Sequence, residues 1–292
     1  MEIENQFLRI AVSNNGGSMT SIYDKKRSKE LLYQPIPNSW KGQDVFIFPF
    51  IARLKDGNYQ VKGKTYEMKN HGLIRYMAGN EMKMPNGDIN ISFASNEETL
   101  KQYPFDFAAD SNYHLDGRKL TITYRVSNTG NEDMPFMIGA HPAFMLPGKK
   151  TRDEFDISGN YLLFAKRYHM KRIFQDDSFS YCIGEEKFRH SDKIMLSKEL
   201  FNDINTIILK AKEFDYVDLI KVDGSAIRIS KPNISYLAIW SDTQWGNYVA
   251  IEPWEGIPDE LCPEKEMSKK KAIKILKPGE NYIFSYSIEI IR

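Results

Sequence analysis

The chain has 292 residues, of which 41% are hydrophobic, and a formal net charge of +1. This composition can build a sizeable core and is not that of a disordered chain, and the balanced charge argues against a dedicated nucleic-acid binder. We find no signal peptide and no apolar run long enough to span a bilayer, and therefore expect a soluble cytoplasmic protein. Cys182 and Cys262 form neither a disulfide framework nor a metal-binding motif, so we expect free thiols and no metal site.

Short stretches of alternating apolar and polar residues recur along the chain and predict strands. In chain order they cover 5–14, 19–24, 59–68, 89–95, 113–128, 134–144, 205–210, 216–230, 235–241, 247–254 and 281–291. Turn-forming pairs occur at Lys62-Gly63, Asp116-Gly117 and Pro278-Gly279. The Asp116-Gly117 pair is the strongest hairpin signal, because a positive φ costs little there.

Helical signals are few and short. Ser95 with Glu98 fits a capping box, and 197–203 has the length of a single short helix. No segment has a long helical period, and no alternation of strands with helices appears. The sequence therefore predicts an all-β fold: one large twisted antiparallel β-sandwich, in a single domain covering 1–292.

Two titratable residues end apolar strands directly before a proline. His141 precedes Pro142 and Glu252 precedes Pro253. A buried carboxylate is costly unless it is paired or used, and a strand end is where a sheet can present side chains to a cleft. Gly139 shares a strand face with His141, and we expect it to leave room beside the histidine for a ring-shaped ligand.

Two further candidates are His71, in the segment KNHGLIR, and Arg53, after the apolar run FPFIA. A guanidinium group offers a rigid set of donors for hydroxyls or anions. On spacing alone, all four candidates are also compatible with ordinary structural roles. His114, His169 and His190 lie in polar, loop-like surroundings, and we interpret them as structural. Glu255 competes with Glu252, but the glycine beside it indicates a turn.

A set of segments occurs in an order that is specific to a known family: PFIARLKDGNY, NHG, YPFDF, MPFMIGAHPAF, YLAIWS and YVAIEPWEGIPD. With these segments the chain resembles the aldose 1-epimerase, or galactose mutarotase-like, family, and most of all its bacterial branch associated with lactose operons. The resemblance covers nearly the whole chain. It implies a large β-sandwich with a sugar site on a concave sheet face, and no metal or organic cofactor.

The resemblance also implies a reaction, the interconversion of the α and β anomers of a free aldose. Glu252 matches the family's general base, His141 the general acid that protonates the ring oxygen, and His71 a second site histidine. Arg53 matches a sugar-binding arginine. The acid must carry a proton near neutral pH, and we expect a nearby carboxylate to favour this.

Two more positions are candidates for sugar binding. Asp203 matches an acidic residue that binds sugar hydroxyls in the family, although a helix-end aspartate would look the same. Trp240 or Trp254 can stack on a sugar, with core packing as the alternative for at least one of them. Many galactose mutarotases carry a tyrosine where this chain has Ala143, which leaves the preferred sugar open.

Other functions remain open at this point. An epimerase for hexose 6-phosphates would need basic side chains that converge on a dianion, and Arg53, Lys55 and Arg75 lie near the site segments. A non-catalytic carbohydrate-binding protein of the same fold would not need a matched acid and base. In each case the partner is a small-molecule sugar, with no nucleic acid or membrane, and the chain is a monomer or a homodimer.

Overall fold

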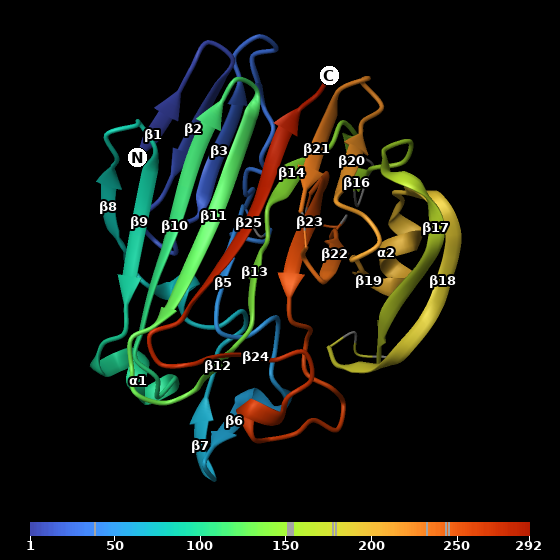
Figure 1. Cartoon of the computed structure of the whole chain (residues 1–292). Coiled ribbons are helices and arrows are strands. Elements are labelled where there is room, and N and C mark those ends of the chain that lie inside the picture. The colour runs from blue at the N-terminus through green and yellow to red at the C-terminus, as the bar shows by residue number, and fades with distance from the viewer. Residues whose placement is uncertain are drawn as a thin grey trace.

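Most of the predicted strands join one antiparallel sheet of 15 strands (Figure 1). The computed structural model describes all residues except 38, 151–154, 177, 179, 232, 243 and 245 and the side chains of 149, 150 and 203. The strand order in the large sheet is β5-β13-β23-β22-β19-β17-β20-β21-β25-β11-β10-β9-β8. The bounds are β5 Phe46–Ile47, β13 Ile138–Ala140, β23 Tyr248–Glu255, β22 Tyr236–Trp240, β19 Thr206–Lys210, β17 Tyr161–Gln175, β20 Tyr216–Ile220, β21 Ala226–Ser230, β25 Asn281–Ile290, β11 Lys119–Asn128, β10 Phe107–Asp116, β9 Ile89–Ala94 and β8 Asn80–Lys83. Off this path, β14 (Ala143–Met145) pairs with β23, and β18 (Cys182–Met195) pairs with β17.

The remaining elements are short. A four-stranded sheet contains β1 Glu2–Glu4, β2 Leu8–Val12, β3 Met19–Asp24 and β4 Lys29–Glu30. Two-stranded pairs form between β6 (Asn58–Val61) and β7 (Lys64–Glu67), β12 (Met134–Phe136) and β24 (Lys274–Leu276), and β15 (Lys149–Lys150) and β16 (Phe155–Asp156). The helices of the described chain are α1 (Glu97–Gln102), α2 (Lys198–Ile204) and the 3-10 turns η1 (Lys55–Gly57), η2 (Ile74–Tyr76) and η3 (Met267–Lys269). None of them is long and apolar enough to cross a membrane.

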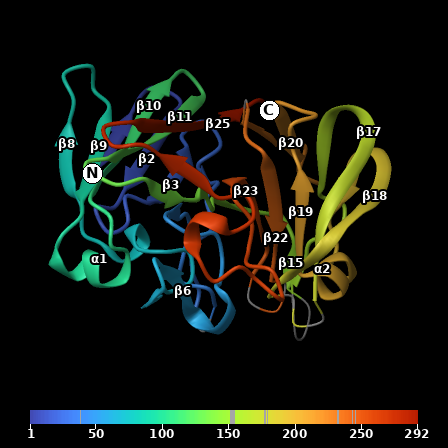
Figure 2. The same ribbon diagram turned by 60° about the horizontal axis from the view of Figure 1, so that its bottom comes forward.

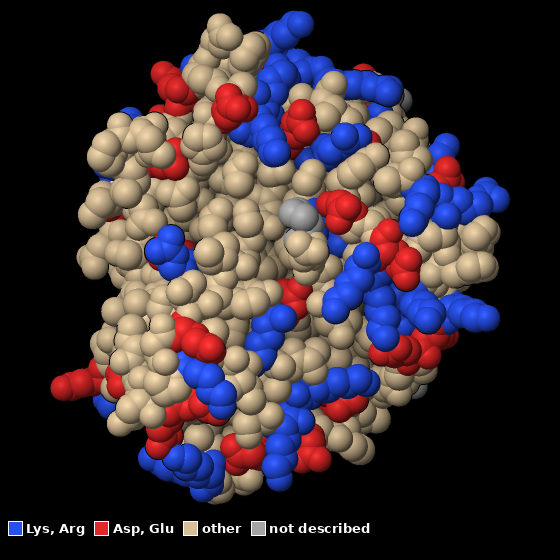
Figure 3. Space-filling view, viewed as in Figure 1, with Lys and Arg blue, Asp and Glu red and all other residues tan. Residues whose placement is uncertain are grey.

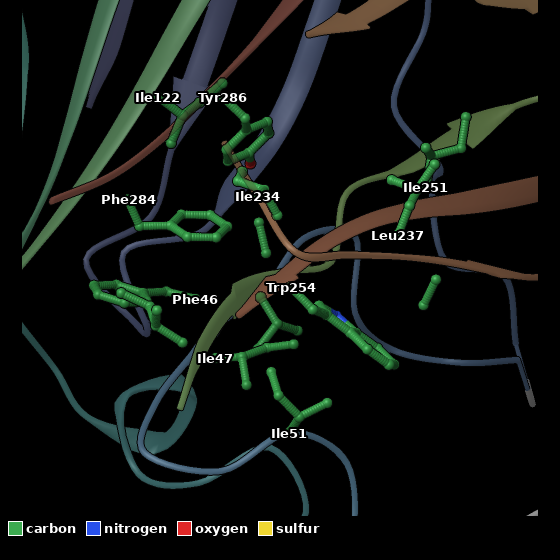
Figure 4. Packing of buried hydrophobic residues seen from close by; sticks show 14 of the residues in the cluster. Phe46, Ile47, Ile51, Ile122, Ile234, Leu237, Ile251, Trp254, Phe284 and Tyr286 are labelled. Carbon is green, nitrogen blue, oxygen red and sulfur yellow. The ribbon is translucent and has the colours of Figure 1, made fainter. Parts of the chain in front are cut away.

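One hydrophobic core joins the small N-terminal sheet to the large sheet. Figures 1 and 2 show β2 and β3 next to β10 and β11, and buried side chains of both sheets belong to the same cluster. Phe46 stacks on Tyr124 with ring centroids 3.9 Å apart, and Tyr124 stacks on Phe284. Figure 4 shows Trp254 within this core, beside Ile47 and Ile51. The predicted all-β fold of packed antiparallel sheets is thus confirmed.

The predicted turns are found, but several boundaries differ. Lys62-Gly63 and Gly117 connect hairpins with positive φ, as expected. The predicted strand 134–144 is three strands, because the chain breaks at Met137 and again at His141 and Pro142. The helix cap predicted at Ser95 lies one residue later. Asn96 caps α1 and exchanges hydrogen bonds with Thr99, because an asparagine side chain reaches the first free amides at least as well as serine.

The long hairpin of β17 and β18 is the largest departure from the prediction. It curls away from the rest of the sheet (Figures 1 and 2), and β18 lies at an edge, where charged side chains of both signs cover the surface (Figure 3). His169 and His190, which we expected in loops, are opposite one another in this hairpin with ring centroids 4.1 Å apart. His114 also lies on a strand, β10, where it contacts Asp88. Charged side chains along β17 and β18 interrupt the alternation of apolar and polar residues that predicts strands, so the sequence did not indicate these two strands.

Candidate functional site

Five of the six predicted site residues line one cavity of about 520 Å³. They are Arg53, His71, His141, Trp240 and Glu252. The side chain of Asp203, the sixth, lies outside the described part of the chain, although its backbone belongs to α2. The cavity lies where β13, β14 and β23 meet the loops before η1 and η2. The end of the β17–β18 hairpin adds Gln175, Ser178 and Ser180 to the lining.

Strand pairing brings His141 and Glu252 together. The backbone N–H of His141 donates to the carbonyl of Val45 over 3.1 Å, and that of Ile251 donates to the carbonyl of Pro142 over 3.1 Å. These bonds fix the break between β13 and β14 against β23. His141 Nε2 lies 3.3 Å from Glu252 Oε2, and both side chains are buried. The two apolar strand ends predicted from the prolines therefore meet in one place.

The space beside Gly139 is filled by protein, which corrects our expectation of a ligand there. A Cβ at this position would lie 2.7 Å from Cδ1 of Trp254, because the indole ring packs across the glycine. Trp254 follows Glu252 by two residues on the same face of β23 and also lines the cavity. The glycine thus makes room for an indole ring that supports the site.

A tight loop holds His71 in place. Its backbone has a φ of 61°, and Gly72 follows with a φ of 77°. A Cβ on Gly72 would lie 2.1 Å from the carbonyl oxygen of Phe48, so no larger residue fits there. The N–H of His71 donates to the Ala52 carbonyl over 2.9 Å, and the N–H of Ala52 donates to His71 Nδ1 over 3.2 Å. Neutral His71 therefore carries its proton on Nε2.

Burial sets the protonation of the site. It raises the pKa of Glu252 well above the ordinary value of 4.5 and lowers the pKa of His141 to about 3. Burial also lowers the pKa of His71, and charge repulsion with His141, Arg75 and Arg53 lowers it further. We expected the carboxylate to keep His141 protonated. The expectation is wrong, because desolvation disfavours both charged forms.

Several buried polar atoms around the cavity have no hydrogen-bond partner within the described structure. They are Asn70 Oδ1, His141 Nδ1, Glu252 Oε2 and Trp254 Nε1. The indole N–H of Trp254 faces the Glu252 carboxyl closely enough to lower its pKa against the effect of burial, but it makes no well-formed hydrogen bond. Buried polar groups in proteins are normally paired. Such a set of free donors and acceptors suits a ligand that carries many hydroxyl groups.

Two arginines give the cavity a positive charge. Arg53 and Arg75 line it, and neither has an ion-pair partner among the described residues. Glu252 is the acidic residue of the described lining, and burial favours its neutral form. Lys55, the third basic residue of the predicted group, points elsewhere, with its ammonium 4.6 Å from the ring of Tyr181.

Sequence reasoning missed Trp40 and Asn70 as residues that line the cavity. Asn70 directly precedes His71, so its position in KNHGLIR could have suggested it. Trp40 is in a loop between β4 and β5 and has no motif or periodicity around it. Its ring centroid lies 4.8 Å from that of His141, a contact that tertiary folding alone creates.

The comparison with known proteins agrees with this geometry. The aldose 1-epimerase family model matches residues 1–289. The chain belongs to the aldose 1-epimerase family. The resemblance found in the sequence segments is thereby confirmed, and the fold and the ordered site segments have a common explanation.

Individual relatives are similar over their full lengths. The plasmid-encoded protein LacX of Lactococcus lactis subsp. lactis is 25% identical over 298 residues, which covers 100% of this chain and 99% of LacX. A galactose mutarotase related enzyme from Lactobacillus acidophilus has a TM-score of 0.91 at 28% identity, covering 100% of this chain and 97% of that one. A galactose mutarotase-like protein from Lactobacillus casei also has a TM-score of 0.91, at 24% identity and 99% coverage of both chains.

Proposed function

We propose that this protein is an aldose 1-epimerase that interconverts the α and β anomers of a free aldohexose. The observation that carries the proposal is the buried pair of His141 Nε2 and Glu252 Oε2, 3.3 Å apart, in a cavity whose buried polar atoms lack partners. Anomer exchange needs one group that accepts a proton and a second that donates one at a neighbouring oxygen. Membership of the family supports the same reaction class.

In the proposed reaction, the Glu252 carboxylate takes the proton from the hydroxyl on C1. The C1 carbonyl forms, the bond from C1 to the ring oxygen breaks, and His141 gives a proton to that oxygen. Rotation about C1–C2 then presents the other face of the aldehyde, and ring closure reverses both transfers. The N–H at Nε2 of His71 donates a hydrogen bond to the sugar near the ring oxygen, since its Nδ1 already accepts from Ala52.

The pair carries one proton through the whole cycle. The closed sugar faces a carboxylate and an imidazolium, and the open sugar faces a carboxylic acid and a neutral imidazole. Burial favours the second arrangement, since it raises the pKa of Glu252 and lowers that of His141. The dry site therefore stabilises the neutral pair that accompanies the open-chain aldehyde, which is the high-energy form of the substrate.

Polarimetry on fresh α-D-glucose and α-D-galactose tests the proposal. The wild type should speed the optical change of at least one sugar, and Glu252→Gln should lower that rate by about 10²–10⁴-fold. Sugar binding without acceleration would instead make the protein a carbohydrate-binding member of the fold. Rates equal to buffer for both sugars, without binding, would reject the proposal.

The pH dependence gives a second test. The reacting pair must carry one proton, and the raised pKa of Glu252 and the lowered pKa of His141 keep a single proton on the pair over a wide range of pH. The value of kcat/KM should therefore fall as the pH rises through the raised pKa, well above 4.5, the ordinary glutamate value, because the pair then loses its proton. An acid limb at 4.5, the ordinary value, would contradict the buried base.

A second candidate function, a hexose 6-phosphate 1-epimerase, is favoured by Arg53 and Arg75. Both line the cavity without a carboxylate partner in the described chain, and a phosphate dianion pairs well with guanidinium groups. Wild type should then saturate with glucose 6-phosphate at much lower concentration than with glucose. Arg75→Gln should raise KM for the phosphosugar by about 10- to 100-fold, as expected for one charged hydrogen bond. Lys55→Gln, a neighbouring basic residue that points away, is the matched control.

A further inference from the structure

The imidazole ring of His141 lacks the hydrogen bond that usually orients a catalytic histidine. Its Nδ1 atom is buried and has no partner among the described residues. Catalytic and metal-binding histidines normally hold this second nitrogen against a carboxylate or a carbonyl, which fixes the ring. Apart from a contact with its own main chain and the approach of Nε2 to Glu252, the ring is therefore held by packing.

Trp40 supplies the closest aromatic packing against this ring. The two centroids lie 4.8 Å apart with an angle of 36° between the planes. His71 and Trp240 approach the same imidazole edge-on, at 5.4 Å and 5.8 Å. Trp40 is thus the ring that lies nearest to the imidazole and closest to parallel with it among these three.

The loop that carries Trp40 is folded to hold the indole there. A Cβ on Gly42 would lie 2.3 Å from Cζ2 of Trp40, so the loop turns back against the ring at a residue without a side chain. The hydroxyl of Tyr33 donates to Ser39 Oγ over 2.6 Å, and the rings of Tyr33 and Trp40 stack at 5.9 Å. The indole also meets Trp240 edge-on at 5.6 Å.

Two small residues of the sheet make room for this arrangement. Ala143 on β14 is paired with Ala250 on β23, and both are fully buried in a small cluster with Tyr33 and Tyr248. Trp40 packs against this cluster. A larger side chain at Ala143 would take the space of the aromatic rings, so the alanine and the tryptophan belong together.

We propose that Trp40 is a positioning residue for His141, which it holds by ring packing in the orientation needed for proton transfer. The proposal rests on the proposed function, in which His141 is the acid. Trp40 itself touches no reacting atom. Its effect is on the rate of the chemical step, because a small misplacement of the acid lowers the rate without changing the contacts that bind the sugar.

The kinetic test compares three variants by polarimetry. Trp40→Leu should lower kcat by about 30- to 100-fold with KM changed by less than about threefold. Trp40→Phe, which keeps an aromatic face, should recover most of the rate. Gly42→Ala keeps the indole but displaces it, and should lower kcat as Trp40→Leu does. Phe284→Leu removes a buried ring of the main core and should leave kcat unchanged.

NMR spectroscopy tests whether Trp40 orients the His141 ring, and it does so independently of turnover. In ¹⁵N-histidine-labelled protein, the two ring nitrogens of His141, assigned with His141→Gln, should give separate resonances in the wild type. In Trp40→Leu they should move toward a common averaged position, because a ring that can turn away from Glu252 loses its fixed tautomer and exchanges between the two neutral tautomers. If they do not move, or if Phe284→Leu loses kcat as strongly as Trp40→Leu, Trp40 is not a positioning residue. An inactive wild type with the expected change in resonances would overturn the proposed function alone.

Discussion

Two glutamates at the two ends of one short stretch of β23 have opposite surroundings. Glu255 is 3% exposed and is fully paired: it accepts from the N–H of Ser235 over 2.7 Å and from its hydroxyl over 2.9 Å, and Lys274 Nζ lies 2.9 Å away. Glu252 is 2% exposed, its Oε2 lies 3.3 Å from His141 Nε2 without a well-formed hydrogen bond, and the indole N–H of Trp254 faces its carboxyl. Glu255 and Glu252 are therefore equally buried but have different roles.

The difference shows what a buried carboxylate does for the molecule. A paired one is stabilised in place, and removing its charge leaves its partners unsatisfied. An unpaired one costs free energy in the folded protein, and that cost is offset when a ligand or a proton transfer uses it. Mutations of paired groups should lower stability, and mutations of unpaired groups should lower activity.

The largest effect on stability is expected at the buried ion pair of Asp259 and Lys270. Lys270 Nζ lies 2.7 Å and 2.9 Å from the two carboxylate oxygens, and the side chains are only 5% and 2% exposed. Asp259→Asn leaves a buried ammonium without its counter-charge and should cost about 3–5 kcal/mol of unfolding free energy. Urea denaturation measures this loss. A loss below about 1 kcal/mol would contradict the claim that paired buried carboxylates stabilise the folded protein.

His141→Gln should lower the mutarotation rate by about 100-fold, or about 2.7 kcal/mol of activation free energy, because an amide cannot deliver a proton. Stability should be kept, since the buried imidazole has no hydrogen bond at Nδ1 to lose. Polarimetry and thermal unfolding on the same sample measure both. His169→Gln, on the β17–β18 hairpin, is the control and should change neither.

The surroundings of Asp44 are intermediate between those of Glu255 and Glu252, and they predict that the stability of the protein depends on pH. Its Oδ2 accepts from the N–H of Met19 over 3.2 Å, and the backbone groups of Met19, Val45 and His141 lower its pKa, yet Oδ1 has no hydrogen-bond partner in the described chain and burial raises the pKa to about 6. The folded state therefore binds this proton more tightly than the unfolded state does. The stabilising contribution is complete below the ordinary value of 3.8 and is lost as the pH rises through about 6.

Asp44→Asn does not titrate and should escape this loss. The unfolding free energy of Asp44→Asn minus that of wild type should be about 2 kcal/mol larger at about pH 8 than at about pH 4. Urea denaturation at both pH values gives the difference. Parallel pH curves for the two proteins would mean that the buried carboxyl is ionised in both states.

The sequence predicted the site residues that lie in recognisable local motifs. His141 and Glu252 each precede a proline and His71 precedes a glycine, which singled them out, and the resemblance to the aldose 1-epimerase family then predicted that all three share one site. The fold class followed from alternating strands and turn pairs. These predictions succeeded because the relevant interactions are local or belong to a recognisable family pattern.

Other features depend on contacts between distant segments. Trp40 meets His141 across about a hundred residues of chain, and Gly139 makes room for Trp254 and not for a ligand. The proton balance of the site could not be predicted either, since burial outweighs the attraction between His141 and Glu252. Burial is a property of the folded molecule, and neither residue type nor spacing reports it.

The most direct test measures rate and stability together in Glu252→Gln and Glu255→Gln. The first variant should lose about 10²–10⁴-fold in mutarotation rate and keep or gain stability, because it removes a buried group that has no ideal partner. The second should keep its rate within about threefold and lose about 1–3 kcal/mol of unfolding free energy. If Glu255→Gln abolishes activity while Glu252→Gln stays active, the assignment of the base on β23 is wrong.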